Sequence, residues 1–144
     1  MDTFILDASV GVKWFFHEEA SDKALTFLER LDQKKIRIVV PEIFYMELAS
    51  ACWKREKKRE ISEEYAIKIP HRIESFSLEK YPDYELFGVA LDNALHYEIS
   101  VYDAVYLSLA EIYLAPLVTA DQMLLKACQG RFDFIESLRD VKIR

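Results

Sequence analysis

The sequence predicts one α/β domain, in which a short parallel sheet is covered by helices on both faces. Short apolar runs alternate with longer segments of helical periodicity, as expected for parallel strands joined by helices. The 144 residues are a length typical of a single domain, and a hydrophobic fraction of 51% excludes intrinsic disorder. Only three glycines occur, in keeping with a high helical content. No repeat or linker divides residues 1–144.

Apolar runs predict a sheet of four to five strands. Three runs, at residues 4–6, 36–40 and 116–119, are predicted to be short buried strands, each followed by a helical pattern. Residues 77–80 and 132–135 are weaker candidates, the latter as an edge strand. Helical periodicity predicts about seven helices, at residues 9–16, 21–32, 42–58, 62–75, 84–97, 101–114 and 121–129. Pro70 lies inside the fourth helix and is expected to kink or divide it.

The chain is acidic, and the excess of acid lies in its second half. It carries 19 Lys and Arg against 25 Asp and Glu, a net charge of −6, and residues 73–144 hold 6 basic and 12 acidic side chains. The glycines lie too far apart for a phosphate-binding loop, which excludes Walker-type and Rossmann-type nucleotide sites. Cys52 and Cys128 fit no metal spacing and are expected to be reduced core residues. With no membrane-length apolar run and no signal-peptide pattern, we expect a cytoplasmic protein.

Four carboxylates are predicted to project toward one rim of the sheet. Asp7 and Asp121 each come just beyond the end of an apolar strand. Asp103 lies in the first turn of a mostly apolar helix, and Glu47 lies one to two turns into the helix after the second strand. In open parallel sheets, ligands bind outside the carboxyl ends of the strands. The four side chains therefore mark a candidate site.

The aspartates also have a structural interpretation as helix caps. Asp7 or Asp121 could cap the following helix, because Asp is a preferred N-cap residue, and Ser100 with Asp103 fits a capping box. Glu47 is harder to explain in this way, since no basic residue lies one helical turn from it. A carboxylate on a mostly apolar face is costly unless a charge, a donor or a metal ion meets it.

Carboxylates gathered at one rim favour a metal site. They would repel one another unless cations bind between them. Oxygen-only ligation suits Mg²⁺ or Mn²⁺, and one or two such ions can activate water for phosphodiester cleavage. His17, His71 and His96 have no mutual metal spacing and are interpreted as surface or helix-end residues. No Ser/His/Asp or Cys/His triad stands out in the sequence.

The motifs around the carboxylates resemble those of the PIN-domain nucleases, in particular the VapC-type toxins of toxin–antitoxin modules. The motifs are Asp7-Ala8-Ser9, Pro41–Ala49 around Glu47, Tyr102–Leu107 around Asp103, and Thr119-Ala120-Asp121. Any one of them is common, but the ordered set spans essentially the whole chain with the family's spacing. The resemblance implies a three-layer α/β/α PIN-like domain.

The resemblance also implies a Mg²⁺- or Mn²⁺-dependent endoribonuclease. Its acidic quartet, holding one or two metal ions, corresponds to Asp7, Glu47, Asp103 and Asp121, and its supporting hydroxyls correspond to Ser9 and Thr119. Metal-activated water would cut single-stranded RNA and leave a 5′-phosphate and a 3′-hydroxyl. The family further implies a homodimer, and inhibition by a small antitoxin whose tail fills a groove of the toxin.

Other residues leave two interpretations open. A run of five positive charges ends one predicted helix, either as a solvated helix end or as a phosphate contact with RNA, and it comprises Lys54, Arg55, Lys57, Lys58 and Arg59. Residues 14–16 are expected in the core, with an antitoxin or dimer groove as the alternative. Tyr102 and Tyr106 are interpreted as packing residues rather than base-stacking platforms.

Two other function classes compete with the nuclease. A phosphatase using Asp7 as nucleophile would need a second aspartate where Ser9 stands, and no cap region is evident. A non-catalytic interaction module would leave the four carboxylates scattered, or paired with Arg and Lys. Convergence of the carboxylates at metal-bridging distance would instead exclude the module.

Overall fold

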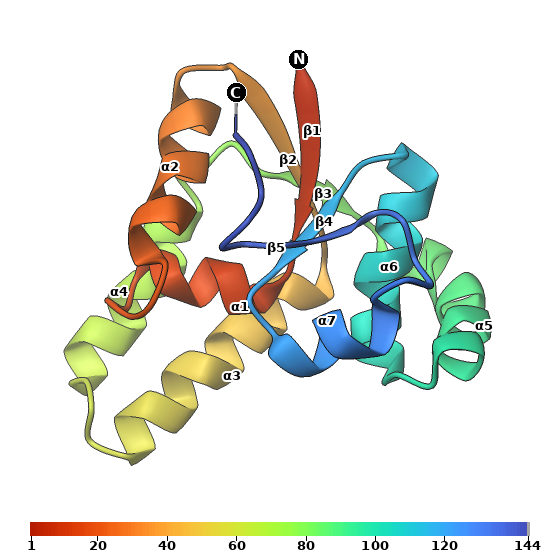
Figure 1. The fold of residues 1–144 in the computed structure, drawn as a ribbon. Helices are drawn as coiled ribbons and strands as arrows, with labels where there is room; N and C mark the ends of the chain where they lie inside the picture. The colour runs from red at the N-terminus through yellow and green to blue at the C-terminus, as the bar shows by residue number, and fades with distance from the viewer. Residues whose placement is uncertain (144) are drawn as a thin grey trace.

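The computed structural model describes residues 1–143 and contains a five-stranded parallel sheet (Figure 1). The strand order is β3-β2-β1-β4-β5, and every neighbouring pair is parallel. The strands are β1 (Asp2–Leu6), β2 (Ile36–Pro41), β3 (Glu79–Tyr81), β4 (Leu117–Thr119) and β5 (Ile135–Ser137). Both weaker strand candidates are therefore confirmed, and both lie at the edges of the sheet.

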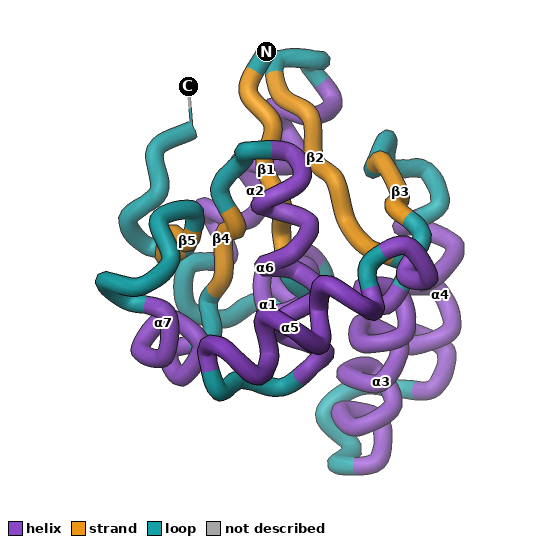
Figure 2. The backbone as a smooth tube through the Cα atoms, turned by 90° about the vertical axis from the view of Figure 1, so that its right-hand side faces the viewer, coloured by secondary structure: helices purple, strands orange, loops and turns teal. Residues whose placement is uncertain are grey.

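Within residues 1–143, seven α-helices complete the three-layer α/β/α architecture (Figures 1 and 2). They are α1 (Ala8–Gly11), α2 (Ser21–Asp32), α3 (Ile43–Lys57), α4 (Glu63–Ile73), α5 (Phe87–Tyr97), α6 (Val101–Tyr113) and α7 (Gln122–Cys128), with 3-10 turns at Val12–Trp14 and Asp83–Glu85. Helices α2 and α4 lie on one side of the sheet, and α5 and α6 on the other. The predicted fold class is confirmed.

Two predictions about the elements differ from the structure: the division of the fourth helix and the start of the last strand. Helix α4 runs without a break through Pro70, so the predicted division at this proline does not occur. The last strand begins at Ile135 rather than at Phe132. Phe132 is buried and packs its ring edge-on against Tyr97, and Phe134 packs against Phe132 in turn. The backbone already reaches β4 at Phe134, whose carbonyl accepts from the Leu117 N–H at 2.6 Å, so only the ring of Phe132 and its neighbours lie outside the strand.

The central strand is buried on both faces. β1 pairs with β2 on one side and β4 on the other, and its last three residues are almost fully buried. Helix α6 contacts β1, β2 and β4, and residues 104–110 of this helix are all buried. A strand covered on both faces is expected to be continuously apolar, which is why a run of only three residues sufficed to predict it.

A glycine allows α1 to approach α3 closely. A Cβ atom at Gly11 would lie 2.7 Å from Cζ of Phe44, whose ring is fully buried and has no room to move aside. The contact joins the helix that follows β1 to the helix that follows β2. It thereby fixes the start of α3, and so Glu47, relative to the end of β1.

Several smaller expectations are also settled. Residues 14–16 are buried, so this aromatic run belongs to the core and forms no exposed groove. Cys52 and Cys128 are buried free thiols. His17, His71 and His96 are exposed. Within residues 1–143, no helix combines the length and the apolar character needed to cross a membrane.

Candidate active site

The four predicted carboxylates come from the segments that follow β1 and β4 and from the first two turns of α3 and α6. Asp7 follows β1 directly, and Asp121 comes two residues after the end of β4. Asp103 is their common neighbour: its charge acts on Asp7 and Glu47, and the charge of Asp121 acts on it in turn. Strand ends supply Asp7 and Asp121, and helices α3 and α6 supply Glu47 and Asp103.

Asp7 is the most enclosed of the four. Its side chain is only 5% exposed, and it accepts hydrogen bonds from Ser9 Oγ on Oδ1 and from Thr119 Oγ1 on Oδ2, each at 2.5 Å. Burial raises the pKa of Asp7 to about 7; the two hydroxyls oppose this rise, while Asp103 and Asp121 add to it. Asp7 stands at the N-cap of α1 without making a capping hydrogen bond, so the capping interpretation fails here.

The two hydroxyls that hold Asp7 are themselves fixed by backbone groups. Thr119 Oγ1 accepts from the N–H of Asp121 at 3.0 Å, and Ser9 Oγ accepts from the N–H of Ala120 at 2.8 Å. Because each hydroxyl oxygen accepts from an amide, its proton is free to be donated to Asp7. This network connects the corner after β1 to the corner after β4. Ser9 and Thr119 are thus placed as supports for the buried carboxylate.

Of the remaining two aspartates, Asp121 caps a helix and Asp103 does not. Asp121 Oδ1 accepts from the N–H groups of Met123 at 2.9 Å and Leu124 at 3.2 Å, so it does cap α7. At the start of α6 the cap is Ser100, whose Oγ accepts from the Asp103 N–H at 3.0 Å. Burial and the charge of Asp121 raise the pKa of Asp103, against an opposing contribution from Ser100.

Glu47 is held by a tyrosine that the sequence did not single out for this role. Tyr106, only 1% exposed, donates its hydroxyl to Glu47 Oε1 at 2.6 Å. Burial raises the pKa of Glu47; the Tyr106 hydrogen bond opposes this, and Asp103 and Asp83 add to it. The pKa of Tyr106 lies well above its ordinary value, chiefly through burial and then through Glu47, so the phenol remains a donor. The one feature of the sequence that could have pointed to Tyr106 is its position one helical turn after Asp103 on α6.

The rim carries charge without basic partners. Within residues 1–143, none of the four carboxylates forms a salt bridge with Lys, Arg or His. In the same part of the chain, no three His, Cys, Asp or Glu side chains are already arranged to hold a metal ion. The carboxylates are thus neither paired with bases nor converged at bridging distance.

The donor set nonetheless fits a hard divalent cation. All four groups are carboxylates, and Mg²⁺ or Mn²⁺ is typically bound by a few carboxylates together with water and substrate phosphate. A buried carboxylate such as Asp7, with other acids near it and no basic partner, is stabilised in its charged form by a cation.

The basic run lies away from this rim. Lys54 is seven residues beyond Glu47 on α3, which is about 10 Å along the helix axis. Arg55 forms an ion pair with Glu18 at 2.7 Å and lies 4.2 Å from the ring centroid of Phe16, so it has a structural role. Lys57 pairs with Glu56 at 3.7 Å. The other three cations of the run, Lys54, Lys58 and Arg59, are exposed.

Comparison with known families identifies the domain. A family profile described as the PIN domain matches residues 4–129, which is most of the chain. The chain belongs to the PIN-domain family. PIN domains are in general nucleases, and the resemblance drawn from the four acidic motifs is confirmed at the level of the family.

Solved structures confirm the PIN fold. PAE2754 from Pyrobaculum aerophilum is similar with a TM-score of 0.64 at 20% identity, over 96% of this chain and 85% of that one. A toxin–antitoxin complex from Klebsiella pneumoniae has a TM-score of 0.65 at 13% identity, over 95% and 98%. VapBC2 from Rickettsia felis, bound to a DNA fragment from its promoter, has a TM-score of 0.62 at 18% identity, over 94% and 98%. Comparison with curated protein sequences gives no match.

Proposed function

We propose that this PIN domain is a metal-dependent endoribonuclease that cleaves RNA by hydrolysis of phosphodiester bonds. The observation that supports this most strongly is the state of Asp7, a buried carboxylate with a pKa near 7 that faces Asp103 and Asp121 without a basic partner. A fold that needed only stability would pair or replace such a group. Retaining it fits a residue whose charge is used on a cation.

Asp7, Glu47, Asp103 and Asp121 are the proposed metal ligands. One or two Mg²⁺ or Mn²⁺ ions, when bound, would supply the positive charge that activates water and stabilises the attacking and leaving oxygens. The protein's own contribution is orientation: Ser9 and Thr119 fix both oxygens of Asp7, and the N-terminus of α7 fixes one oxygen of Asp121. The exposed cations Lys54, Lys58 and Arg59 are proposed to contact phosphates of the RNA beyond the cleavage point.

The experiment that tests this function is cleavage of structured RNAs with and without Mg²⁺ or Mn²⁺. We expect cleavage only with metal, products with a 5′-phosphate and a 3′-hydroxyl, and loss of cleavage in Asp7→Asn protein. The matched control is Asp22→Asn, which changes an exposed aspartate in the first turn of α2. Equal cleavage by Asp7→Asn and wild-type protein, or cleavage that persists in chelator, would rule the proposal out.

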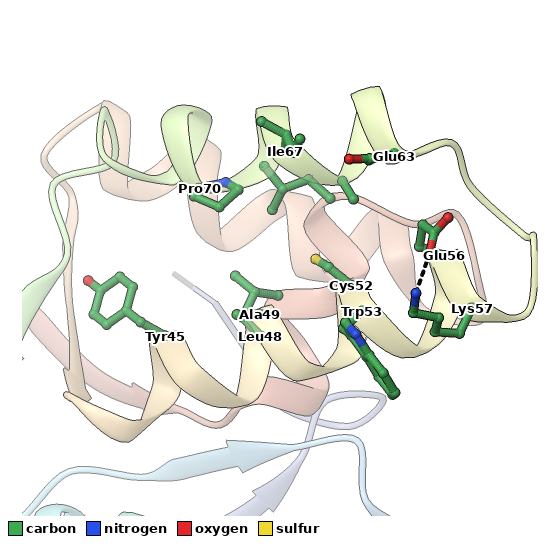
Figure 3. A pocket seen from close by; sticks show the side chains of 12 residues that line it. Tyr45, Leu48, Ala49, Cys52, Trp53, Glu56, Lys57, Glu63, Ile67 and Pro70 are labelled. Carbon is green, nitrogen blue, oxygen red and sulfur yellow. Dashed lines mark ion pairs between the residues drawn. The ribbon is translucent and has the colours of Figure 1, made fainter.

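We further propose that the nuclease is the toxin of a type II toxin–antitoxin pair and that a cognate antitoxin inhibits it. Support comes from the toxin–antitoxin complexes among its structural neighbours. Support also comes from a groove of about 460 Å³ between α3 and α4 (Figure 3). Leu48 and Cys52 from α3 and Ile69 from α4 line it, beside the more exposed Trp53 and Ile67. An apolar segment of a protein inhibitor fits such a groove.

Coexpression tests this partnership. A small protein encoded next to this chain should copurify with it and suppress its RNA cleavage, and Ile67→Glu should weaken the complex without reducing cleavage by the free enzyme. The matched control is Lys68→Glu, which adds a negative charge at the next position of α4. Cleavage that is undiminished in the copurified complex would exclude an inhibitory partner.

A homodimer is proposed from the outer face of α5. Tyr84, Phe87, Leu91 and Leu95 follow one another at helical spacing, and each is more than half exposed. Monomeric soluble proteins rarely expose apolar patches of this kind, and α5 is an outer helix in Figure 2. Light scattering should give twice the chain mass for the wild-type protein and a single chain mass for Leu91→Glu/Leu95→Glu. A wild-type monomer would exclude the dimer.

A further inference from the structure

Tyr106 makes a long-range contact that connects two walls of the site. It lies on α6, one turn after Asp103, and its hydroxyl reaches Glu47 on α3, 59 residues earlier in the sequence. The ring is 1% exposed, so the hydroxyl is closed to bulk water. Its 2.6 Å bond to Glu47 Oε1 is short, as expected when a hydroxyl donates to a carboxylate.

The orientation of Glu47 depends on this one bond. Among the hydrogen bonds of residues 1–143, that from Tyr106 is the only one made by the Glu47 carboxylate. A glutamate side chain has three rotatable torsions, and repulsion from Asp103 would turn it away from the rim. The tyrosine engages Oε1, and within residues 1–143 no hydrogen bond engages Oε2.

We propose that Tyr106 is a positioning residue that holds Glu47 in place to share a divalent cation with Asp103 and Asp7. The inference rests on the proposed function. At Glu47, as at Asp7, a neutral hydroxyl donates to the carboxylate: Tyr106 in the first case, Ser9 and Thr119 in the second. Donors around metal ligands generally fix their orientation in this way. A phenol suits the task because it fixes a carboxylate without neutralising it, whereas an arginine would form an ion pair and compete with the cation.

The test compares Tyr106→Phe with Tyr113→Phe. Both variants remove one hydroxyl from α6 and keep the ring, but Tyr113 packs against Tyr81, away from Glu47. Binding of Mn²⁺ is measured by calorimetry without RNA. We expect Tyr106→Phe to weaken binding about 10- to 100-fold, the range typical of lost partners of metal ligands, and Tyr113→Phe to leave it unchanged. Unfolding midpoints of both variants confirm that the fold is retained.

Two further measurements separate positioning from a general structural role. In RNA cleavage, Tyr106→Phe should raise the Mn²⁺ concentration for half-maximal activity, with the rate largely restored at saturating Mn²⁺. In a Glu47→Ala background, Tyr106→Phe should change Mn²⁺ binding no further, because the carboxylate that Tyr106 positions is absent. A reduced rate with an unchanged Mn²⁺ midpoint, or additive losses in the double variant, would overturn the inference.

The outcome also distinguishes the inference from the function on which it rests. If the wild-type protein binds Mn²⁺ and cleaves RNA, and Tyr106→Phe does both equally well, then Tyr106 has no positioning role and the proposed function stands. If the wild-type protein neither binds Mn²⁺ nor cleaves RNA, the proposed function is wrong and the inference is overturned with it.

Discussion

Two sets of acidic side chains in this protein have opposite surroundings. Glu79, the first residue of β3, accepts two hydrogen bonds of 2.7 Å from Arg37 on β2, and these bonds lower the pKa of Glu79. Glu18 is partly buried, which acts to raise its pKa, but hydrogen bonds from Arg55 and Lys13 reverse the effect and lower it. These glutamates are stabilised as anions by cations of the same chain.

Within residues 1–143, the rim acids Asp7, Glu47, Asp103 and Asp121 have no such cationic partner. The pKa values of Asp7, Glu47 and Asp103 are all raised, first by burial and then by the charges of their acidic neighbours. Neutral hydroxyls fix the carboxylates of Asp7 and Glu47 without cancelling their charge. The contrast shows that Lys and Arg side chains neutralise Glu18 and Glu79, whereas within residues 1–143 none neutralises the rim acids. The rim acids therefore cost stability, as expected of groups kept for function.

The largest effect on RNA cleavage is expected from a substitution at Asp103, the rim acid whose charge acts on two others. Asp103→Asn removes the charge that acts on both Asp7 and Glu47, so RNA cleavage should fall by more than about 100-fold, beyond the loss typical of a ligand's partner. The same variant should unfold at a higher temperature in metal-free buffer, because repulsion at the rim is relieved. Gel assays and thermal unfolding measure the two effects.

Glu79→Gln is the counterpart from the paired set. It should retain wild-type cleavage and lose some stability, because it breaks the contact with Arg37. The comparison between the two sets of acids would be wrong if Asp103→Asn were less stable than wild type without metal, or if Glu79→Gln lost activity.

A divalent cation should stabilise the wild-type protein. Binding to the folded state alone contributes about 2.7 kcal/mol when the free ion stands at 100 times its dissociation constant. Urea unfolding with and without Mn²⁺ measures this gain, which should disappear in Asp103→Asn. An equal gain in both proteins would mean that Mn²⁺ binds elsewhere. No gain in either protein would mean that Mn²⁺ does not bind to the rim acids.

The fold was largely predictable because its signals are local. A three-residue apolar run sufficed for β1, since a strand buried on both faces has no polar alternation to interrupt it. Helix α2 was predicted at its observed bounds, Ser21–Asp32. The errors arose where tertiary packing decides the role of an apolar residue, as at Phe132, whose ring joins an aromatic cluster while β5 begins at Ile135.

The site was predictable in part for the same reason. Asp7 and Asp121 follow strand ends, and parallel strands bring their carboxyl ends to one rim. The partners of these acids could not be predicted, because hydrogen bonds between distant elements leave no periodic signal. Tyr106 and Glu47 are 59 positions apart, and Arg55 and Glu18 are 37 apart. Packing of the helices decides both pairs, and in the second case it places Arg55 in an ion pair with Glu18.

A smaller effect is expected from the paired set. Glu18→Gln weakens the contacts with Arg55 and Lys13 and should lower the free energy of unfolding by about 0.5–1 kcal/mol, the upper range for accessible ion pairs. The matched control is Glu64→Gln, which disrupts a well-exposed pair with Lys68 and should change stability little. Urea unfolding measures both, and cleavage should be unchanged. Equal stability of the two variants would show that the Glu18 cluster contributes nothing beyond an ordinary surface pair.

The pH dependence of metal-free stability provides the smallest and most selective test. Unfolded glutamate titrates near pH 4.3, whereas the pKa values of folded Glu18 and Glu79 are lower. Their stabilisation is therefore complete above about pH 4.3 and is lost as the pH falls through the folded values. Urea unfolding at steps from pH 6 to pH 3 should show wild-type protein losing more stability than Glu18→Gln/Glu79→Gln. Parallel curves would mean that the pairs contribute nothing. The rim acids cannot produce this loss, because a carboxylate whose folded pKa is raised gains stability on protonation.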